Sequence, residues 1–365
     1  MLNILTIDIE DYFQVHALSN VIKYEEWDKF ECRVERNTDR ILEILNSARC
    51  PYRLKQQRST SAHEHFEHRS TAALNNSPFI PTNSEFKTHN SPKGTFFVLG
   101  WIAERYPELI RRVQKEGHEI ACHGYGHKLL YCQSKEDFRN DIRRAKAILE
   151  DITGIEIIGY RAPSYSITNK SQWALEILAE EGFQYDSSIF PIRHDFYGMP
   201  NAPRFPFLIS LNGNQNVEFS VLNYELEDSK PITQNSKLNI NNSITHSRIN
   251  SNSLIEFPIS TVRILGQNFP IGGGGYFRLF PYSLIKKGLR SINKKESKPF
   301  IFYVHPWEFD PDQPRINNLP FKSRFRHYVN LTKTEEKFKK LIEDFQFSTI
   351  RQILIQNSQF KTRTS

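Results

Sequence analysis

The sequence is poor in sulfur: it has 4 cysteines and 2 methionines in 365 residues, and no two cysteines have the CxxC spacing. This excludes a disulfide framework, and we interpret the cysteines as reduced thiols. No apolar run reaches the ~20 residues needed to cross a bilayer, which excludes a membrane-spanning helix. The N-terminus also lacks the basic start and apolar stretch of a secretory signal. From these absences we expect a cytoplasmic protein.

Positive charge is present but scattered. Lys and Arg outnumber Asp and Glu by 48 to 41, giving a formal net charge of +7, yet no five basic residues follow one another. No nucleic-acid motif is present, which excludes nucleic acid as the expected partner. The charge also fits a peripheral contact with a membrane face, or with a phosphate-bearing glycan carrier.

Two stretches differ in composition from the remainder. Residues 50–93 are rich in Ser, Thr, Asn, Pro and His, and residues 211–253 are dominated by Asn and Ser. Such segments cannot bury enough apolar area to offset the entropy lost on ordering. We predict one domain over residues 1–355, interrupted by mobile insertions at 50–93 and 211–253 and followed by a polar tail at 356–365.

Outside the insertions, short apolar runs alternate with helical patterns. Strands are predicted over residues 2–9, 95–99, 119–122, 155–160, 254–259 and 300–304. Helices are predicted on the apolar stripe within 34–45, after Pro107, and over 134–153, 171–181 and 335–345. Ser134 and Asp137 form a capping-box pattern at the start of the third. The alternation predicts an α/β fold with a parallel sheet, and about seven such units favour a barrel, in which chemistry gathers where strands end.

Reactive side chains do follow the predicted strands. They are Asp8, Glu10, Asp11, His123, His127, Arg161, Ser164 and His305. Three carboxylates within four residues repel one another unless a cation or basic partner is present. Two histidines four residues apart can turn both rings toward one ion, and two histidines with one carboxylate leave positions open for water and substrate. This set predicts metal-assisted hydrolysis of an amide or ester, with one divalent ion that is best fitted by Zn²⁺.

At this point the chain resembles a known family. The strings TIDIEDYFQV, GTFFVLGWIAERYPELI, GHEIACHGYGHKLLY, GYRAPSYSIT, YDSSIFPIRHDFYG and GGGGYFRLFP occur in this order. They resemble the polysaccharide deacetylases of the NodB-homology type (carbohydrate esterase family four), in particular the subgroup encoded beside exosortase-type exopolysaccharide loci. The resemblance covers nearly all of residues 1–46, 94–210 and 254–355. It implies a distorted (β/α)7-type barrel and a metal-dependent hydrolase that removes N- or O-acetyl groups from sugars.

The resemblance also implies roles. Asp8 matches the general base, Arg161 the arginine that orients it, and His305 the general acid, while His123 and His127 match the metal histidines. The common first motif has two adjacent aspartates, but here Ile9 follows the first.

Two candidates remain for the carboxylate ligand. Strand alternation favours Glu10, on the same side as Asp8. If the strand ends at residue 10, the turn could instead aim Asp11 at the metal, so both stay candidates.

Further residues are expected to touch substrate or to support the site. The backbone N–H of Ser164 is expected to serve an oxyanion hole, and Asp186 to orient His305. Tyr276 and Arg278 follow a glycine run that we expect at the barrel mouth, and Trp307 is interpreted as a sugar platform.

The sequence thus predicts a deacetylase in exopolysaccharide biosynthesis. Its expected partner is an acetylated amino-sugar glycan or a lipid-linked oligosaccharide. Two alternatives stay open: a metal-dependent hydrolase of a small cyclic amide or ureide, and a catalytically inactive carbohydrate-binding relative. The sequence does not specify the glycan, its linkage, N- or O-acetyl, the physiological metal or the oligomeric state.

Overall fold

The computed structural model describes residues 1–48, 91–211, 217–221 and 253–356. Most of the two predicted insertions and almost all of the predicted tail lie outside these ranges, as does the histidine-rich stretch at 63–68. Within the ranges, none of the helices combines the length and the apolar composition that a membrane crossing requires.

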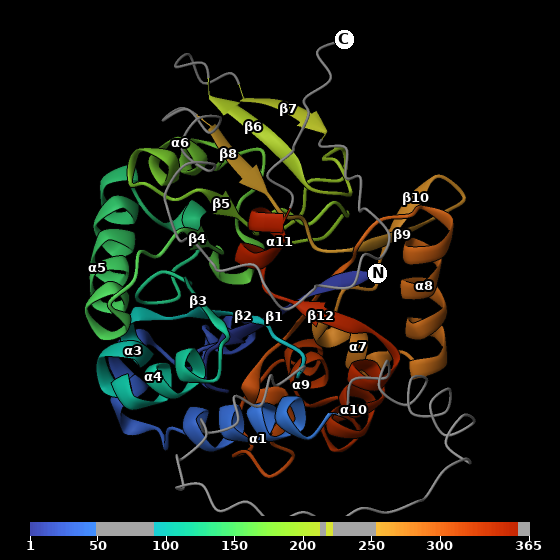
Figure 1. The fold of residues 1–365 in the computed structure, drawn as a ribbon. Helices are drawn as coiled ribbons and strands as arrows, with labels where there is room; N and C mark the ends of the chain where they lie inside the picture. The colour runs from blue at the N-terminus through green and yellow to red at the C-terminus, as the bar shows by residue number, and fades with distance from the viewer. Residues whose placement is uncertain (49–90, 212–216, 222–252, 357–365) are drawn as a thin grey trace, which may run out of the picture.

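A single large sheet forms the centre of the molecule (Figure 1). Across it the strands are β11 (Ile301–Val304), β1 (Leu2–Ile9), β2 (Thr95–Val98), β3 (Glu119–Cys122), β4 (Gly159–Tyr160), β5 (Tyr185–Asp186), β8 (Ser253–Glu256), β6 (Phe207–Leu211) and β7 (Val217–Val221). Neighbours from β11 through β8 are parallel, and β6 is antiparallel to both of its neighbours. A further strand, β12 (Gln346–Ser348), pairs with the start of β1. The predicted α/β fold with a parallel sheet is therefore confirmed.

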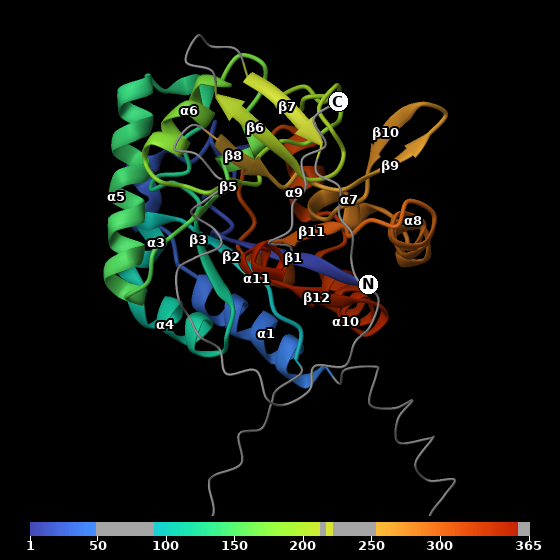
Figure 2. The same ribbon diagram turned by 45° about the horizontal axis from the view of Figure 1, so that its top comes forward.

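Most of the helices cover the outside of this sheet, as Figures 1 and 2 show. The helices are α1 (Val34–Ser47), α3 (Gly100–Arg105), α4 (Pro107–Lys115), α5 (Lys135–Thr153), α6 (Trp173–Glu180), α7 (Gly274–Leu279), α8 (Tyr282–Lys295), α9 (Phe321–Tyr328), α10 (Thr334–Asp344) and α11 (Ile350–Gln356). The last of them, α11, instead packs against the inner cluster that contains Ile4 and Phe97. The capping box of α5 forms as predicted, because Ser134 Oγ accepts a hydrogen bond from the N–H of Asp137.

Between β8 and β11, irregular backbone takes the place of a regular ladder. The N–H of Ile301 donates to Ser260 Oγ over 2.7 Å, and the N–H of Tyr303 donates to the carbonyl of Gly272 over 2.7 Å. A side chain at Gly273 would meet the carbonyl oxygen of Tyr303 at 1.9 Å, and its φ is 132°. Only glycine fits there, so the glycine run lets this segment lie between the two ends of the sheet.

Some predicted ranges differ from the structure. The strand expected over 254–259 ends at residue 256, in β8. The strand expected over 155–160 is reduced to β4, with two residues. Strand β7 lies inside the range predicted as a mobile insertion. Its sequence, VEFSV, alternates apolar and polar residues, and this period of two is a strand signal that the Asn-rich surroundings obscured.

Candidate active site

One cavity of about 270 Å³ opens where the parallel strands end. It is lined by Asp8, Glu10, Val15, His16, Ala17, Asn20, His123, His127, Ser164, Tyr165, His194, Phe196, Tyr197, Tyr303, His305, Trp307, Ser323 and Arg326. The ends of β1, β3, β4 and β11 thus bring together residues that are up to 300 positions apart in sequence, as the predicted barrel requires.

Asp8 is held by a buried arginine. Arg161 is fully buried, and its Nη1 donates to Asp8 Oδ1 over 2.6 Å and to Thr6 Oγ1 over 2.8 Å. Its other nitrogens donate to the carbonyl and hydroxyl of Ser187. The guanidinium therefore has a fixed orientation, and it leaves Asp8 Oδ2 directed toward the cavity side, 3.7 Å from His305 Nε2.

Glu10, His123 and His127 form the one group among the described residues with the geometry of a metal site. Their ligand atoms all lie within 4.8 Å of one another. His123 Nδ1 lies 2.8 Å from the carbonyl of Arg161, which leaves Nε2 for a metal. Burial lowers the pKa of His123 to about 4, so the ring is neutral at pH 7, as a ligand must be.

The Glu10 carboxylate fits a cation as well. Oε2 lies 2.8 Å from His127 Nε2 but forms no well-directed hydrogen bond with the described residues. Burial raises the pKa of Glu10, but the charges of His127, His305 and His123 outweigh burial and bring the pKa to about 2. A buried, ionised carboxylate beside two imidazoles is a donor set that Zn²⁺ and similar ions prefer.

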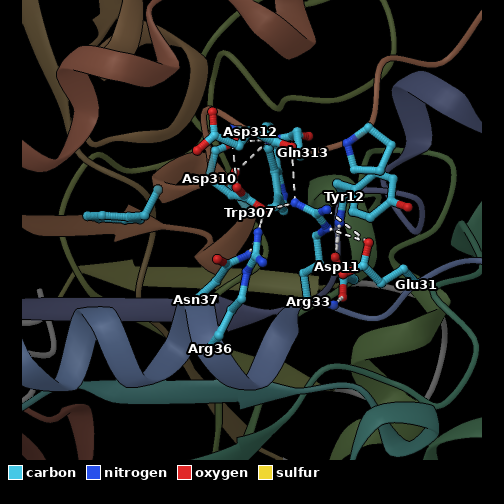
Figure 3. Close-up of polar contacts among 12 residues, drawn as sticks. Asp11, Tyr12, Glu31, Arg33, Arg36, Asn37, Trp307, Asp310, Asp312 and Gln313 are labelled. Carbon is cyan, nitrogen blue, oxygen red and sulfur yellow. Dashed lines mark hydrogen bonds and ion pairs between the residues drawn. The ribbon is translucent and has the colours of Figure 1, made fainter.

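Asp11 points away from this group. Its carboxylate accepts hydrogen bonds from the N–H groups of Tyr12, Arg33 and Val34, the last two at the start of α1. Figure 3 shows Asp11 beside Arg33, on the side of α1. Of the two carboxylates that the sequence left open, the geometry brings Glu10 to the histidines and gives Asp11 to the helix N-terminus.

Only 5% of the Trp307 surface is exposed, so little of its ring is accessible to a sugar. Its Nε1 donates to Glu10 Oε1 over 3.2 Å, and its ring stacks on His327 at a centroid distance of 4.5 Å. Gln313 donates to the Trp307 carbonyl over 2.8 Å (Figure 3). Its Oε1 lies 2.7 Å from His327 Nε2. The expected sugar platform is therefore mainly a support for the Glu10 carboxylate.

His305 has a carboxylate partner, but it is Glu308 rather than Asp186. Glu308 Oε2 accepts from the His305 N–H over 3.0 Å and lies 3.2 Å from His305 Nδ1. Burial lowers the pKa of His305, but the charges of Glu308, Glu10 and Asp8 outweigh it and raise the pKa to about 9. The short 3-10 helix η5 (Pro306–Phe309) creates this contact by folding residue 308 back onto residue 305.

Arg278 lies behind Glu308 and does not line the cavity. It is 3% exposed; its Nε donates to Glu308 Oε1 over 2.8 Å, and its other nitrogens donate to carbonyls of residues 326, 327 and 329. The expected contact of Arg278 with substrate has no support from this cavity and stays a prediction. Tyr276 is also placed differently, since it lines a neighbouring hollow and lies beside Tyr197.

Asp186 lies in the sheet, fully buried, next to Glu256 across the β5–β8 pairing. Its Oδ1 accepts from Ser188 Oγ, which in turn accepts from the N–H of Ala162. It therefore supports the turn after β4, and the carboxylate expected to orient His305 is Glu308 instead.

Ser164 occupies that turn with φ 51° and ψ 30°, a left-handed conformation that is uncommon for serine. Ser164 lines the cavity, and its backbone N–H forms no hydrogen bond with the described part of the chain. An unpaired N–H in a strained turn at the cavity is a suitable oxyanion donor.

Sequence reasoning missed several residues of the site, above all Tyr303 and Arg326, which line the cavity, and Glu308, which lies behind His305. The spacing of three between His305 and Glu308 was a usable signal, because it matches a capping box. Arg326 gave no such signal, since α9 lacks a clear apolar stripe.

Two family models match the chain. Residues 86–185 match the model described as polysaccharide deacetylase, and residues 228–355 match a domain of unknown function (DUF3473). The first contains His123, His127, Arg161 and Ser164, and the second contains His305 and Glu308. The family that the sequence motifs resemble is thus supported by a match that contains His123 and His127.

Two relatives illustrate the similarity. A peptidoglycan-N-acetylglucosamine deacetylase of Bacillus cereus is 37% identical over 93 residues, which are 25% of this chain and 34% of the relative. A peptidoglycan deacetylase of Helicobacter pylori is 29% identical over 111 residues, 30% of this chain and 36% of the relative. The match thus spans about a third of the length of these curated relatives.

A solved structure shares the fold. It is a Mycobacterium smegmatis protein assigned to the polysaccharide deacetylases, with a TM-score of 0.50 and 17% identity. The superposition covers 99% of this chain and 92% of that one. At this identity the likeness establishes the fold, and the chemistry depends on the cavity described above.

Proposed function

We propose that this chain is a metal-dependent deacetylase that hydrolyses the N-acetyl, or O-acetyl, group of a sugar in a glycan. One observation carries the proposal: a single cavity holds a carboxylate fixed by a buried arginine, a Glu/His/His group, and a histidine backed by its own carboxylate. Base, metal ligands and acid are the three parts that amide hydrolysis needs.

Glu10, His123 and His127 would hold the ion, for which we propose Zn²⁺ on account of the two imidazoles and one carboxylate. A divalent cation in this position supplies Lewis acidity, which activates water and polarises the acetyl carbonyl.

The protein's own groups supply the proton transfers. Asp8 Oδ2 takes the proton of the attacking water, while Arg161 fixes the carboxylate through Oδ1. The N–H of Ser164 donates to the oxygen that becomes negative as the carbonyl carbon turns tetrahedral. His305, protonated because Glu308 raises its pKa, gives its Nε2 proton to the leaving sugar nitrogen or oxygen.

The separation of Asp8 and His305 suits this division of roles. Asp8 Oδ2 and His305 Nε2 lie 3.7 Å apart and both residues line the cavity, so both groups can reach the same acetyl group. Phe196, Tyr197 and Tyr303 give the cavity aromatic walls that suit the apolar faces of sugar rings. We propose an acetylated amino-sugar glycan, free or lipid-linked, of an exopolysaccharide pathway as substrate.

The test measures acetate released from acetylated chito-oligomers and from O-acetylated xylo-oligomers, before and after chelation and on restoring Zn²⁺. We expect turnover that a chelator abolishes and Zn²⁺ restores. Asp8→Asn should keep the metal and lose turnover, because Asp8 is outside the ligand group. His305→Ala should lose amide hydrolysis but spare activated aryl esters, whose leaving group needs no proton.

Other outcomes would overturn the proposal. Acetate release that is unaffected by His123→Ala, or metal loss in Asp8→Asn, would contradict the assigned roles. Stoichiometric metal with no turnover of any acetylated glycan would favour an inactive carbohydrate-binding relative. The cytoplasmic location stays a prediction from sequence, which fractionation of the producing cells tests.

A further inference from the structure

Arg326 is an exposed residue that places a positive charge at the cavity, and no carboxylate of the described residues forms an ion pair with it. It lines the cavity together with Ser323, one turn earlier on α9. Its guanidinium forms no ion pair and no hydrogen bond with the residues that the structure describes. An arginine at a binding cavity without an internal partner is available to a ligand.

The cavity's own carboxylates do not compensate this charge. Asp8 is bound by Arg161, and Glu10 lies against His127 and Trp307. Burial raises the pKa of Tyr197 and Tyr276, and burial and Arg326 lower that of His194, so these neighbours carry no negative charge at neutral pH. Asp195 brings a carboxylate close to His194 and Tyr276, but no ion pair joins it to Arg326.

Hydrogen bonds from Arg278 fix the backbone that carries Arg326. Arg278 Nη2 donates to the carbonyl of Arg326 over 2.9 Å, and Nη1 donates to the carbonyl of His327 over 2.7 Å. His327 is buried and bonded to Gln313. The start of the Arg326 side chain is therefore fixed, which reduces the entropy that a bound ligand must offset.

Desolvation decides which ligand this arginine suits. A glycan that covers Arg326 removes water from the guanidinium, and sugar hydroxyls replace that water only in part. A carboxylate or phosphate replaces it fully and can accept two parallel hydrogen bonds. A neutral glycan would thus lose binding energy at this position, and an anionic one would gain it.

We propose that Arg326 recognises an anionic group, a carboxylate or a phosphate, on the acetylated glycan, so that the substrate class is acidic. The proposal rests on the function proposed above and specifies its substrate. Asp8, His305 and the metal group act at the acetyl group, while Arg326 binds the charge elsewhere on the same glycan.

Three acetylated oligosaccharides of equal length test this: a neutral chito-oligomer, one with a uronate residue, and one with a terminal phosphate. Each is given to the wild type, Arg326→Gln, Arg326→Lys and Arg324→Gln. Arg324 is exposed on the same helix but does not line the cavity, so its variant controls for general charge. Acetate release gives kcat/KM. Calorimetry in the Asp8→Asn background gives Kd without turnover.

We expect the wild type to prefer an acidic oligomer over the neutral one by about tenfold or more. Arg326→Gln should remove most of this preference in both kcat/KM and Kd, Arg326→Lys should restore part of it, and Arg324→Gln should retain it. Preference for the uronate identifies an acidic sugar, and preference for the phosphate identifies a carrier phosphate.

Equal kcat/KM for all three oligomers, or an equal loss for all three in Arg326→Gln, would overturn the anionic subsite while leaving the deacetylase intact. No acetate from any oligomer would instead overturn the proposed function, and the Kd series would still decide whether Arg326 recognises charge.

Discussion

The indole Nε1 of Trp307 donates a hydrogen bond to Oε1 of Glu10 over 3.2 Å. This bond joins the turn after β11 to the end of β1, and it occupies the carboxylate oxygen opposite to the one near His127. Outer partners of this kind orient metal ligands and tune their affinity. The loop that carries the proposed acid His305 therefore also holds the proposed metal carboxylate.

Trp307→Phe should weaken metal binding while leaving the fold intact. Phenylalanine keeps the stacking on His327 but loses the N–H, so Glu10 is free to rotate. We expect the Kd for Zn²⁺ to rise by about 10- to 100-fold, measured by competition with a chromophoric chelator. Trp101→Phe is the control, because Trp101 is equally buried but packs against Arg105 and Phe13 away from the cavity. Equal affinity in both variants would contradict the prediction.

Glu10→Gln and Asp11→Ala should affect different properties: the first metal binding, the second the free energy of unfolding. Asp11→Ala leaves buried N–H groups of Tyr12 and Val34 without their acceptor, so it should lower the free energy of unfolding by about 2 kcal/mol. It should still bind metal. Glu10→Gln should lose metal and keep its stability in the metal-free protein. Denaturant unfolding and metal titration of both variants measure this, and metal loss in Asp11→Ala would show that Asp11 is the ligand.

Local patterns explain what the sequence predicted well. The run LNILTIDI is buried from Asn3 onward, and the Ser134 capping box begins α5 where expected. Each of these features depends on neighbours within four residues. Asp8 and His305 each follow a parallel strand, so their proximity can be predicted without knowing the conformation of the loops.

Contacts set by irregular backbone could not be derived in this way. Whether Glu10 or Asp11 meets the histidines depends on where the amides at the start of α1 lie. Whether Asp186 or Glu308 meets His305 depends on a single 3-10 turn. The place of Arg278 after the glycine run suggests a residue at the mouth of the barrel. In the structure it is buried, and the Glu308 carboxylate compensates its charge.

Glu308→Gln should shift the pH dependence of deacetylation. His305 must carry a proton to give it up, so the alkaline limb of activity falls as the pH rises through the pKa of His305, about 9. Removing the Glu308 charge lowers the pKa, so the alkaline limb of kcat should move to lower pH, and amide turnover should fall more than aryl-ester turnover. Asp310→Asn is the control, because Asp310 pairs with Arg33 and Arg36 instead. An unmoved limb in Glu308→Gln would exclude Glu308 as the partner that keeps His305 protonated.

Asp186 and Glu256 should make stability depend on pH. They are neighbours across β5 and β8, both fully buried, and one oxygen of each has no hydrogen-bond partner unless they share a proton. Burial raises the pKa of Asp186 to about 6 and, together with the Asp186 charge, raises that of Glu256 well above its ordinary value of 4.5.

The folded pair therefore binds more protons than the unfolded chain. Its contribution to stability is complete below the ordinary carboxyl pKa values and is lost as the pH rises through the raised ones. Glu256→Gln replaces the shared proton with an amide N–H, and its carbonyl can still accept from the N–H of Ile189. We expect the variant to match the wild type at pH 5 and to exceed its free energy of unfolding by about 1 kcal/mol or more at pH 8. Urea unfolding at both pH values measures the difference. If the free energy of unfolding changes equally between the two pH values in both proteins, the pair shares no proton.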